Sequence, residues 1–417
     1  MVRLICTLFG ILALCSCYHE KNMVWVEGIE VSDDTIEFSQ VLGMPKQMVL
    51  EIKDIVDLDG KKCHLPPNVM LHFAGGIIKN GALVGDMTKI VGSGACFDRV
   101  RILGTWHVPE ISTSLFKDLD YDNSLKDVVA LANPRVSNKI LIQPGSYQVT
   151  AQHGGDACLP ICGKTELALN GTVRLVPNGF TNYDIIRAEG DSVVITGKGT
   201  IVGDKHTHTG VEGEWGMGIR LNHAHNAHIS GLTIRDCWGD CIYVGGKSTN
   251  VTIDRCKLFH GRRQGVSITS ANGVTVKECK IAKIAGTAPE YAIDVEPNKG
   301  DAVDHVTIEN VTVKNCKGGF LVYGRAENAH VGKVTVRNCD VSSDKKVTIA
   351  VNKCDMLIVQ DCDITQHNTW GCILCKEVGH VEVRNNNLHY DKGIMARLKD
   401  WARPMFGKKK VKVVDIE

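Results

Sequence analysis

The chain has 417 residues, with 48 Lys and Arg against 47 Asp and Glu and a formal net charge of +1. This near-neutral balance provides no field to capture a nucleic-acid backbone or an anionic membrane surface, so neither is expected as a direct partner. Hydrophobic residues make up 43% of the chain, which excludes a disordered protein and allows a large buried core.

The first segment of the chain, residues 1–16, is predicted to be an export signal. Arg3 provides a positive charge, and residues 4–14 are an apolar stretch too short to span a bilayer. Leu14 stands three positions before Cys17, with a small residue directly before the cysteine. This pattern resembles a bacterial lipoprotein signal, which implies cleavage before Cys17 and acylation of its thiol. An ordinary secretory signal is the alternative.

The expected location is therefore the cell envelope, in the periplasm or at the outer-membrane surface. Contact with the membrane is expected only through the lipid anchor.

Residues 25–112 are predicted to form a small β-rich N-terminal domain, because short apolar runs alternate with glycine turns. The clearest of these runs are residues 69–73, 75–78 and 100–106. Residues 122–132 follow with a short amphipathic helix pattern that Pro134 stops, and residues 139–147 are typical of a strand, a turn and a second strand.

From residue 192 onward the sequence repeats itself. Each copy is a short alternating run rich in β-branched residues, such as residues 250–258, followed by a small or apolar residue at one recurring ladder position. The ladder residues are Leu232, Cys256, Cys279, Val311, Cys339, Cys362 and Asn386, at steps of 24, 23, 32, 28, 23 and 24 residues. Runs of this period, each unable to bury its own face, predict parallel strands stacked as the coils of a solenoid.

The cysteines are predicted to pack and not to form disulfides. Four of the 17 occupy the ladder position, where a buried cysteine acts as a small hydrophobic residue. Cys158 and Cys162 lie in a loop-like stretch, and both pairing and packing remain open for them. No cysteine pair has a matching second pair or histidine partners at the spacing of a zinc site, so no metal site is predicted.

A second column, in which a small residue precedes an apolar one, begins each coil. Its members are Gly218 and Ile219, Cys241 and Ile242, Gly265 and Val266, Ala292 and Ile293, and Gly319 and Phe320. With residues 169–172, 199–201 and 294–298, these motifs resemble the right-handed parallel β-helix proteins of the pectate-lyase-like superfamily. That superfamily holds pectate lyases, polygalacturonases, uronan epimerases and phage tailspikes.

The resemblance implies an all-β fold, a right-handed parallel β-helix over residues 115–392 with the N-terminal β-rich extension before it. It also implies that the short helix caps the open end of the solenoid. Residues 393–417 are expected to form a helical or irregular cap over the last coil.

Strand alternation predicts which residues of the central coils face outward. With Ile219, Ile242, Val266 and Ile293 inward, the outward residues are Arg220, Asn222, Tyr243, Gly245, Ser267, Thr269, Asp294 and Glu296. Asp240 and the run from Arg262 to Gln264 stand just before these strands. Because adjacent coils lie ~4.8 Å apart, these groups are expected to converge on one polar patch, a candidate sugar-binding groove.

The loop of residues 203–217 is expected to rise beside the same patch. Asp204 and His206 are candidate sugar contacts from this loop, and Trp215 or Trp238 are candidate platforms for a sugar ring. An isolated loop histidine is more often solvated than catalytic, and His206 and His208 without a third ligand are weak evidence for a metal. The predicted substrate-binding residues are Arg220, Trp215, Tyr243, Asp204, His206 and Trp238.

Two reactions are open for the patch, and the predicted catalytic residues are Asp240, Arg262, Arg263, Asp294 and Glu296. Inverting hydrolysis needs two carboxyl groups ~6.5–9.5 Å apart, about the reach of Asp240 and Asp294 two coils apart. β-Elimination needs a base, for which Tyr243 is a further candidate, and a cation that neutralises a uronate, with Ca²⁺ as an option. We expect the arginine pair to hold Asp294 ionised.

Gly239 and Asp240 resemble part of the polygalacturonase pattern, but the chain lacks the rest of that pattern. It has no aspartate pair at 240 and 241, no Asn-Thr-Asp upstream and no Arg-x-Lys downstream. The expected function is thus an exported carbohydrate-active enzyme that cleaves an acidic polysaccharide by hydrolysis or β-elimination. A uronan C5-epimerase and a noncatalytic, tailspike-like glycan-binding protein are the alternatives, although an export signal disfavours a virion part.

Overall fold

The computed structural model describes residues 29–31, 48–121, 123–367 and 371–390. The chain divides into two compact units, Met1–Trp106 and His107–Glu417. The predicted export signal, the lipidation site Cys17 and the predicted C-terminal cap at 393–417 lie outside the described residues. Within the described ranges, no helix combines the length and the apolar character that a membrane crossing requires.

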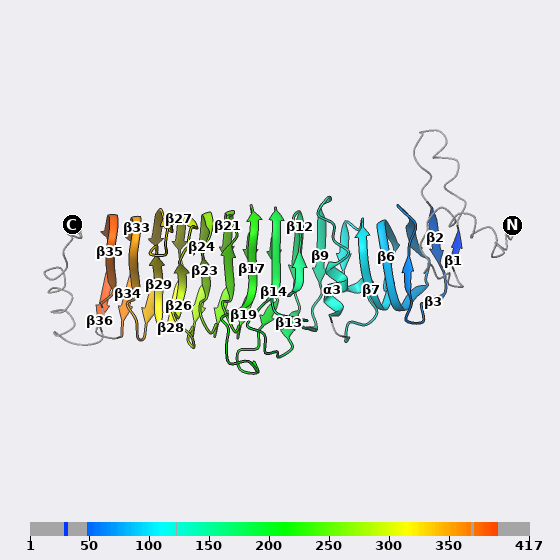
Figure 1. The fold of residues 1–417 in the computed structure, drawn as a ribbon, viewed down its shortest axis with the longest axis horizontal. Coiled ribbons are helices and arrows are strands. Elements are labelled where there is room, and N and C mark those ends of the chain that lie inside the picture. The colour runs from blue at the N-terminus through cyan, green and yellow to red at the C-terminus, as the bar shows by residue number, and fades with distance from the viewer. Residues whose placement is uncertain (1–28, 32–47, 122, 368–370, 391–417) are drawn as a thin grey trace, which may run out of the picture. The chain divides into compact units, whose positions relative to one another are not determined.

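The N-terminal unit is a stack of short strands centred on one long strand, β6 (Figure 1, blue and cyan). Its strands are β1 (Ile29–Val31), β2 (Val49–Ile52), β3 (Ile55–Asp57), β4 (Lys62–His64), β5 (Met70–Phe73), β6 (Ile77–Gly92) and β7 (Phe97–Trp106). Strand β6 pairs in parallel with β3, β4, β5 and β7, and only β1 and β2 pair antiparallel in this sheet. Phe73 and Phe97 meet edge to face in its core, with ring centroids 5.4 Å apart.

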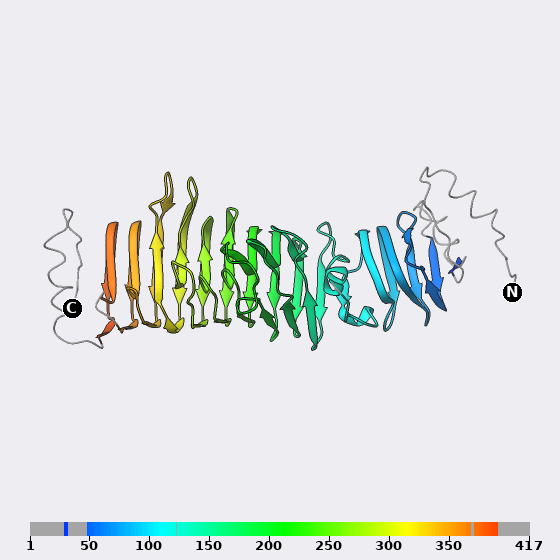
Figure 2. The same cartoon turned by 60° about the horizontal axis from the view of Figure 1, so that its bottom comes forward.

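The second unit is a parallel β-helix whose coils each pass through three faces (Figures 1 and 2). We call the first the groove face. It consists of β11 (Ala157–Ile161), β14 (Asn182–Asp191), β17 (Trp215–His225), β20 (Ile242–Gly245), β23 (Val266–Ile268), β26 (Tyr291–Val295), β29 (Gly318–Tyr323) and the first parts of β33 (Ile349–Gln360) and β35 (Ile373–Arg384).

The other two faces complete each coil. The second face consists of β8 (Glu110–Ser112), β9 (Asn138–Ile142), β12 (Thr165–Leu169), β15 (Val194–Thr196), β18 (His228–Ser230), β21 (Ser248–Asp254), β24 (Ala271–Lys277), β27 (Ala302–Glu309), β30 (His330–Val331), β31 (Lys333–Arg337) and the later parts of β33 and β35. The third face consists of β10 (Ser146–Val149), β13 (Thr172–Leu175), β16 (Thr200–Val202), β19 (Thr233–Arg235), β22 (Lys257–Phe259), β25 (Lys280–Ala282), β28 (Thr312–Cys316), β32 (Asp340–Ser343), β34 (Asp363–Gln366) and β36 (Asn387–Tyr390).

The core of this unit is built from columns of like side chains in register. On the groove face one column has members no more than 1% exposed: Ile186, Ile219, Ile242, Val266, Ile293, Phe320 and Ile349. Burial of each such side chain contributes roughly 1.5–3 kcal/mol. The predicted inward positions of the central coils are therefore confirmed, and so is the all-β solenoid.

The ladder cysteines line the corner between the second and third faces, and their four thiols are free. Each sulfur lies near backbone carbonyls, as where Cys279 Sγ is 3.2 Å from the Lys277 oxygen. Asn386 continues the column with a polar side chain. Its Nδ2 donates to the Val359 oxygen and its Oδ1 accepts from the Cys362 amide, both at 2.9 Å.

One short α-helix, α3 (Ser124–Val129), packs on β8, β10 and β11 in the first coils. It is shorter than the predicted 122–132, although Leu125, Val128 and Val129 are buried as an amphipathic helix requires. A 3₁₀ turn (Thr113–Leu115) precedes it. Cys158 is buried and Cys162 half-buried, and both are free.

We predict that Cys256→Ala lowers the free energy of unfolding by about 1–2 kcal/mol, because it leaves a small cavity in the ladder column. Chemical denaturation measures this, with Cys162→Ala as the control, since Cys162 is half-buried and outside the column. Mass spectrometry of the unreduced protein that found Cys256 linked to Cys279 would contradict the packing role.

Candidate functional site

The candidate site lies on the groove face, where four consecutive coils place polar side chains in one outward column. Arg220, Tyr243, Ser267 and Asp294 are register partners on β17, β20, β23 and β26. The parallel register thus brings together residues that are 23 to 27 positions apart in the sequence, one coil step of ~4.8 Å at a time.

Two carboxyl groups at this site are connected through one glutamine. Gln264 donates its backbone amide to Asp240 Oδ1 at 3.1 Å and its Nε2 to Asp294 Oδ2 at 2.6 Å. Its own Oε1 accepts from the Tyr291 amide at 3.1 Å, which fixes the orientation of the amide group. Gln264 is fully buried, so it holds both carboxyl groups at a fixed separation, two coils apart as the sequence predicts.

The environment of Asp294 favours its protonated form. Its side chain is 3% exposed, and its Oδ1 accepts no hydrogen bond and lies near the Glu296 carboxylate. Burial, and then the charges of Glu296 and Asp240, raise the pKa of Asp294 well above its usual value, and Arg263 opposes this only in part. The expectation that the arginine pair keeps Asp294 ionised is therefore wrong, because desolvation outweighs the single nearby guanidinium.

Asp240 receives more hydrogen bonds from the protein than Asp294 does, although it is completely enclosed. Besides the Gln264 amide, it accepts a hydrogen bond from Ser267 Oγ at 2.8 Å. Burial raises the pKa of Asp240 to about 6, against the opposing effects of Arg263 and these two donors. At neutral pH Asp240 is thus mostly ionised, whereas the surroundings of Asp294 favour its protonated form.

The half-buried residues around this pair form the accessible part of the site. Tyr243 accepts a hydrogen bond from Thr269 Oγ1 at 2.7 Å, and the Arg220 guanidinium lies 4.5 Å from the centre of the tyrosine ring. Glu296 is half-buried next to Asp294. These three residues line one continuous face with the buried carboxyl groups, as the alternation of the strands predicts.

A buried aspartate that the sequence analysis missed organises the arginines. Asp184 is fully buried on β14 and accepts from Arg220 Nε at 2.8 Å and from Arg187 Nε at 2.6 Å. One carboxylate shared by two guanidiniums leaves a net positive charge at this end of the site. Arg187 and Arg220 are register partners in neighbouring coils. Extending the sequence repeat one coil toward the N-terminus would therefore have predicted this arginine pair.

The loop of residues 203–214 is anchored by a stack of four side chains. Trp238 lies between His208, with ring centroids 3.9 Å apart, and the Arg262 guanidinium, 3.7 Å from the indole centre. Tyr183 stacks beyond His208 at 6.1 Å. Asp204 accepts hydrogen bonds from both Tyr183 and His208, the latter at 2.8 Å, which closes the base of the loop.

This stack moves three predicted site residues out of reach of a sugar. Asp204 is 2% exposed with its oxygens engaged, and both faces of the Trp238 ring are covered. Arg262 donates to the carbonyls of Gly213 and Trp238, and burial lowers its pKa. In this structure these three residues position the loop and do not contact the groove. The stack covers both faces of the Trp238 indole, and the polar atoms of Asp204 and Arg262 are already hydrogen-bonded.

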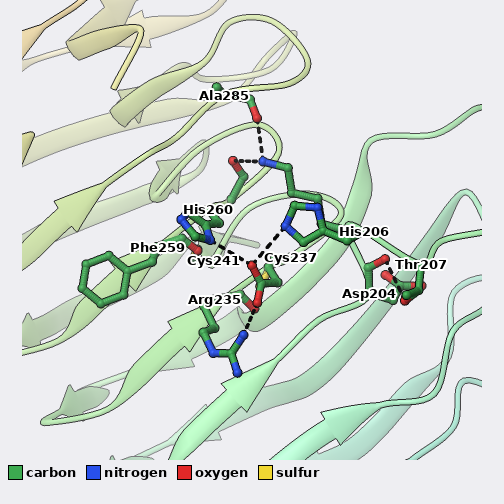
Figure 3. A network of polar contacts seen from close by, with 12 residues as sticks. Asp204, His206, Thr207, Arg235, Cys237, Cys241, Phe259, His260 and Ala285 are labelled. Carbon is green, nitrogen blue, oxygen red and sulfur yellow. Dashed lines mark hydrogen bonds and ion pairs between the residues drawn. The ribbon is translucent and has the colours of Figure 1, made fainter. Parts of the chain in front are cut away.

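The remaining loop residues are placed differently. Trp215 is 47% exposed at the start of β17, as a sugar platform requires. Arg263 pairs with Glu214 at 3.3 Å and lies near both buried carboxyl groups. His206 points toward Asp236 and His260 (Figure 3) and not, as predicted, into a sugar-binding contact.

Glycines let the end of the loop press directly on the turn that carries Asp240. A Cβ on Gly239 would lie 2.5 Å from the Glu214 oxygen, and one on Gly216 would lie 2.5 Å from the Tyr183 ring. The Gly239 amide donates to the Gly216 oxygen at 2.8 Å. The end of the loop is therefore packed tightly against the Asp240 turn.

Among the described residues, one group of three potential metal ligands converges, namely His206, Asp236 and His260. The carboxyl groups of the groove do not form such a group in this part of the chain.

Comparison with known proteins identifies the fold class of this unit. Residues 170–300 and 291–400, together more than half of the chain, match the family described as "Right handed beta helix region". The uncharacterized protein YclG of Bacillus subtilis (strain 168) is 31% identical over 200 residues, 41% of this chain and 34% of that protein. The SPbeta prophage-derived uncharacterized protein YorA of the same organism is 28% identical over 215 residues, 45% of this chain and 36% of that protein.

The chain thus spans about a third of the length of these curated relatives. Two solved structures are similar in fold at 14% sequence identity. They are a hyperthermoactive exopolygalacturonase from Thermotoga maritima, with a TM-score of 0.51 over 68% of this chain and 81% of that one, and the A-module of the mannuronan C-5 epimerase AlgE6 from Azotobacter vinelandii, with a TM-score of 0.50 over 66% and 84%.

We predict that Trp238→Ala makes the loop of residues 203–214 more sensitive to proteases, because the substitution removes the ring that Arg262 and His208 clasp. Limited proteolysis followed by mass spectrometry measures the cleavage rate. Trp215→Ala is the matched control, since Trp215 is exposed and outside the stack. Equal cleavage rates in the two variants would show that the stack does not anchor the loop.

Proposed function

This chain belongs to the right-handed β-helix family, and we propose that it is an enzyme that cleaves an acidic polysaccharide on the groove face. The observation that carries the proposal is the pair formed by Asp294, whose burial favours the protonated form, and the half-buried Glu296 beside it. A protonated carboxyl can serve as the general acid of glycoside hydrolysis, and a carboxylate on the same face can serve as its base. The names of the two structural neighbours support a polysaccharide as the substrate class.

In the proposed reaction Asp294 is the general acid. Its proton goes to the glycosidic oxygen as the bond to the anomeric carbon breaks. Glu296 is the general base, which takes a proton from the water that attacks that carbon after its side chain has turned away from Asp294, because inversion needs the two carboxyl groups ~6.5–9.5 Å apart. Because Asp294 is 3% exposed, Glu296 or Arg263 moves aside as the sugar enters.

Asp240 acts through Asp294 and is a positioning residue. It is completely enclosed, so it contacts no substrate, but its bond to the Gln264 amide fixes the side chain that binds Asp294. Its negative charge also helps to keep Asp294 protonated.

The proposed preference for an acidic sugar rests on the arginines. Arg187 and Arg220 share the single carboxylate of Asp184, and guanidinium groups have enough donors to bind a uronate as well. Trp215 offers an exposed ring for stacking of the same chain. An uncharged glycan would leave this positive charge without a partner.

A second candidate reaction is proton abstraction from C5 of a uronate, which leads to β-elimination or epimerisation. It is favoured by Tyr243, whose oxygen faces the groove column with Arg220 against its ring. A Ca²⁺ requirement belongs to this candidate, because a cation neutralises the uronate carboxylate.

A panel of acidic and neutral polysaccharides distinguishes these reactions. Hydrolysis releases reducing ends without absorbance at about 235 nm, elimination produces both, and epimerisation changes the uronate composition without cleavage. Binding without any turnover would replace the enzyme with the noncatalytic glycan-binding protein. We also propose export as a lipoprotein, with Cys17 acylated, and mass analysis of the N-terminal peptide tests this.

We predict that Asp294→Asn lowers turnover by about 10²–10⁴-fold, the usual effect of removing a general acid, and leaves the fold intact. Asp340→Asn on the third face is the control, because its half-exposed carboxylate pairs with Lys314 and lies outside the groove face. If Asp294→Asn cleaves the substrate at the wild-type rate, the groove face is the wrong surface.

We predict that Asp240→Asn retains part of the activity and shifts its alkaline limit to lower pH. The substitution removes a negative charge that raises the pKa of Asp294, so the acid loses its proton at lower pH. The pH dependence of kcat/KM measures the shift. A uniform loss of rate with an unmoved limit would mean that Asp240 acts only through the fold.

A further inference from the structure

A second polar cluster includes one residue of the same loop. Figure 3 shows His206 and His260 pointing toward each other from two separate segments, with Arg235 nearby. Between them is the Asp236 carboxylate, and the potential ligand atoms of all three residues lie within 4.8 Å of one another. The function proposed above uses none of these side chains.

The separations in this cluster match the edges of a metal tetrahedron. His206 Nε2 is 3.4 Å and His260 Nδ1 is 3.1 Å from the same oxygen, Asp236 Oδ1. Zn²⁺ binds nitrogen and oxygen ligands at ~2.0–2.2 Å, so neighbouring ligands of a tetrahedral ion are about 3.3 Å apart. Only a small approach of the two imidazoles is needed to complete three positions.

The two basic side chains near the cluster, Arg235 and Lys205, do not bond Asp236 Oδ1. Arg235 pairs with the other carboxylate oxygen of Asp236, and Lys205 donates to the Ala285 carbonyl at 2.7 Å. Arg235 therefore fixes the orientation of the carboxylate through the oxygen that does not face the histidines, as hydrogen-bond partners of metal-binding carboxylates do.

The parallel register fixes two of the three ligands. Asp236 and His260 each follow a third-face strand, and the residues before them, Arg235 and Phe259, are direct register partners. Both have left-handed backbones, with φ of 58° and 56°, so consecutive coils present them in the same direction. The loop brings His206 across to them.

We propose that His206, Asp236 and His260 bind a divalent transition-metal ion, with Zn²⁺ as the reference, and leave the fourth position to water. Two imidazole nitrogens and one carboxylate oxygen suit Zn²⁺, Co²⁺ or Ni²⁺, and do not suit Ca²⁺ or Mg²⁺, which take oxygen ligands.

The ion joins three segments that lead to the groove. Asp236 stands four residues before Asp240, and His260 stands four residues before Gln264. His206 belongs to the loop that ends at Trp215. Metal binding therefore clamps the loop to the two turns that hold the carboxyl pair.

The test uses full-length, chelator-treated protein without substrate, so that it is independent of the proposed reaction. Calorimetric titration with Zn²⁺ and the visible spectrum with Co²⁺ measure binding. We expect one ion per chain. His206→Ala and His260→Ala should each weaken its binding by more than ~10-fold, because even the loss of a residue that only hydrogen-bonds to a metal ligand typically costs that much. His206 is largely exposed, so its substitution leaves the fold intact.

His228→Ala is the matched control, because His228 contacts Asp254 at 2.6 Å on the second face but has no third ligand there among the described residues. It should bind Zn²⁺ as the wild type does. Zn²⁺ should also protect residues 203–214 from proteolysis in the wild type and not in His206→Ala. Absence of binding by the wild type, or equal affinities for His206→Ala and His228→Ala, overturns the proposal.

Discussion

In-register stacking of parallel coils is the constraint on which the rest of this structure depends. Backbone hydrogen bonds fix successive strands ~4.8 Å apart, so a side chain in one coil can only meet its counterparts in the next. The inward column from Ile186 to Ile349 is one result of this constraint. The outward column from Arg220 to Asp294 is another, and it has the same spacing. A single geometric rule thus produces both the core and the candidate site.

Burial of the two carboxyl groups is tolerated because the stack supplies hydrogen-bond donors at matched heights. Asp240 accepts hydrogen bonds from the Ser267 hydroxyl and the Gln264 amide, and these two bonds allow it to ionise at neutral pH despite its enclosure. Asp294 receives a single donor and faces other carboxylates, so keeping its proton is the less costly state. The difference between the two environments, and not the residue type, separates their roles.

The sequence analysis succeeded where the periodicity of the repeat determines position and failed where an insertion does. Ile219 and Ile293 were predictable as inward residues, and Asp294 as a member of the groove column, because each belongs to the repeat. The enclosure of Trp238 between Arg262 and His208 was not, since His208 comes from a loop that is longer than the loops at the same corner of the coils that follow it. The prediction that Asp294 is ionised was wrong for a related reason. A sequence shows which charged residues are neighbours, but it does not show how far a side chain is removed from solvent.

The short coil length has a consequence for how the chain folds. Each ladder step joins residues 23 to 32 positions apart, so every coil closes a short loop and contacts mainly its neighbours. No coil has to wait for a distant part of the sequence before its strands pair. Assembly can therefore begin at any well-packed pair of coils and extend in both directions, and the carboxyl pair forms as soon as three adjacent coils, those carrying β20, β23 and β26, are in place.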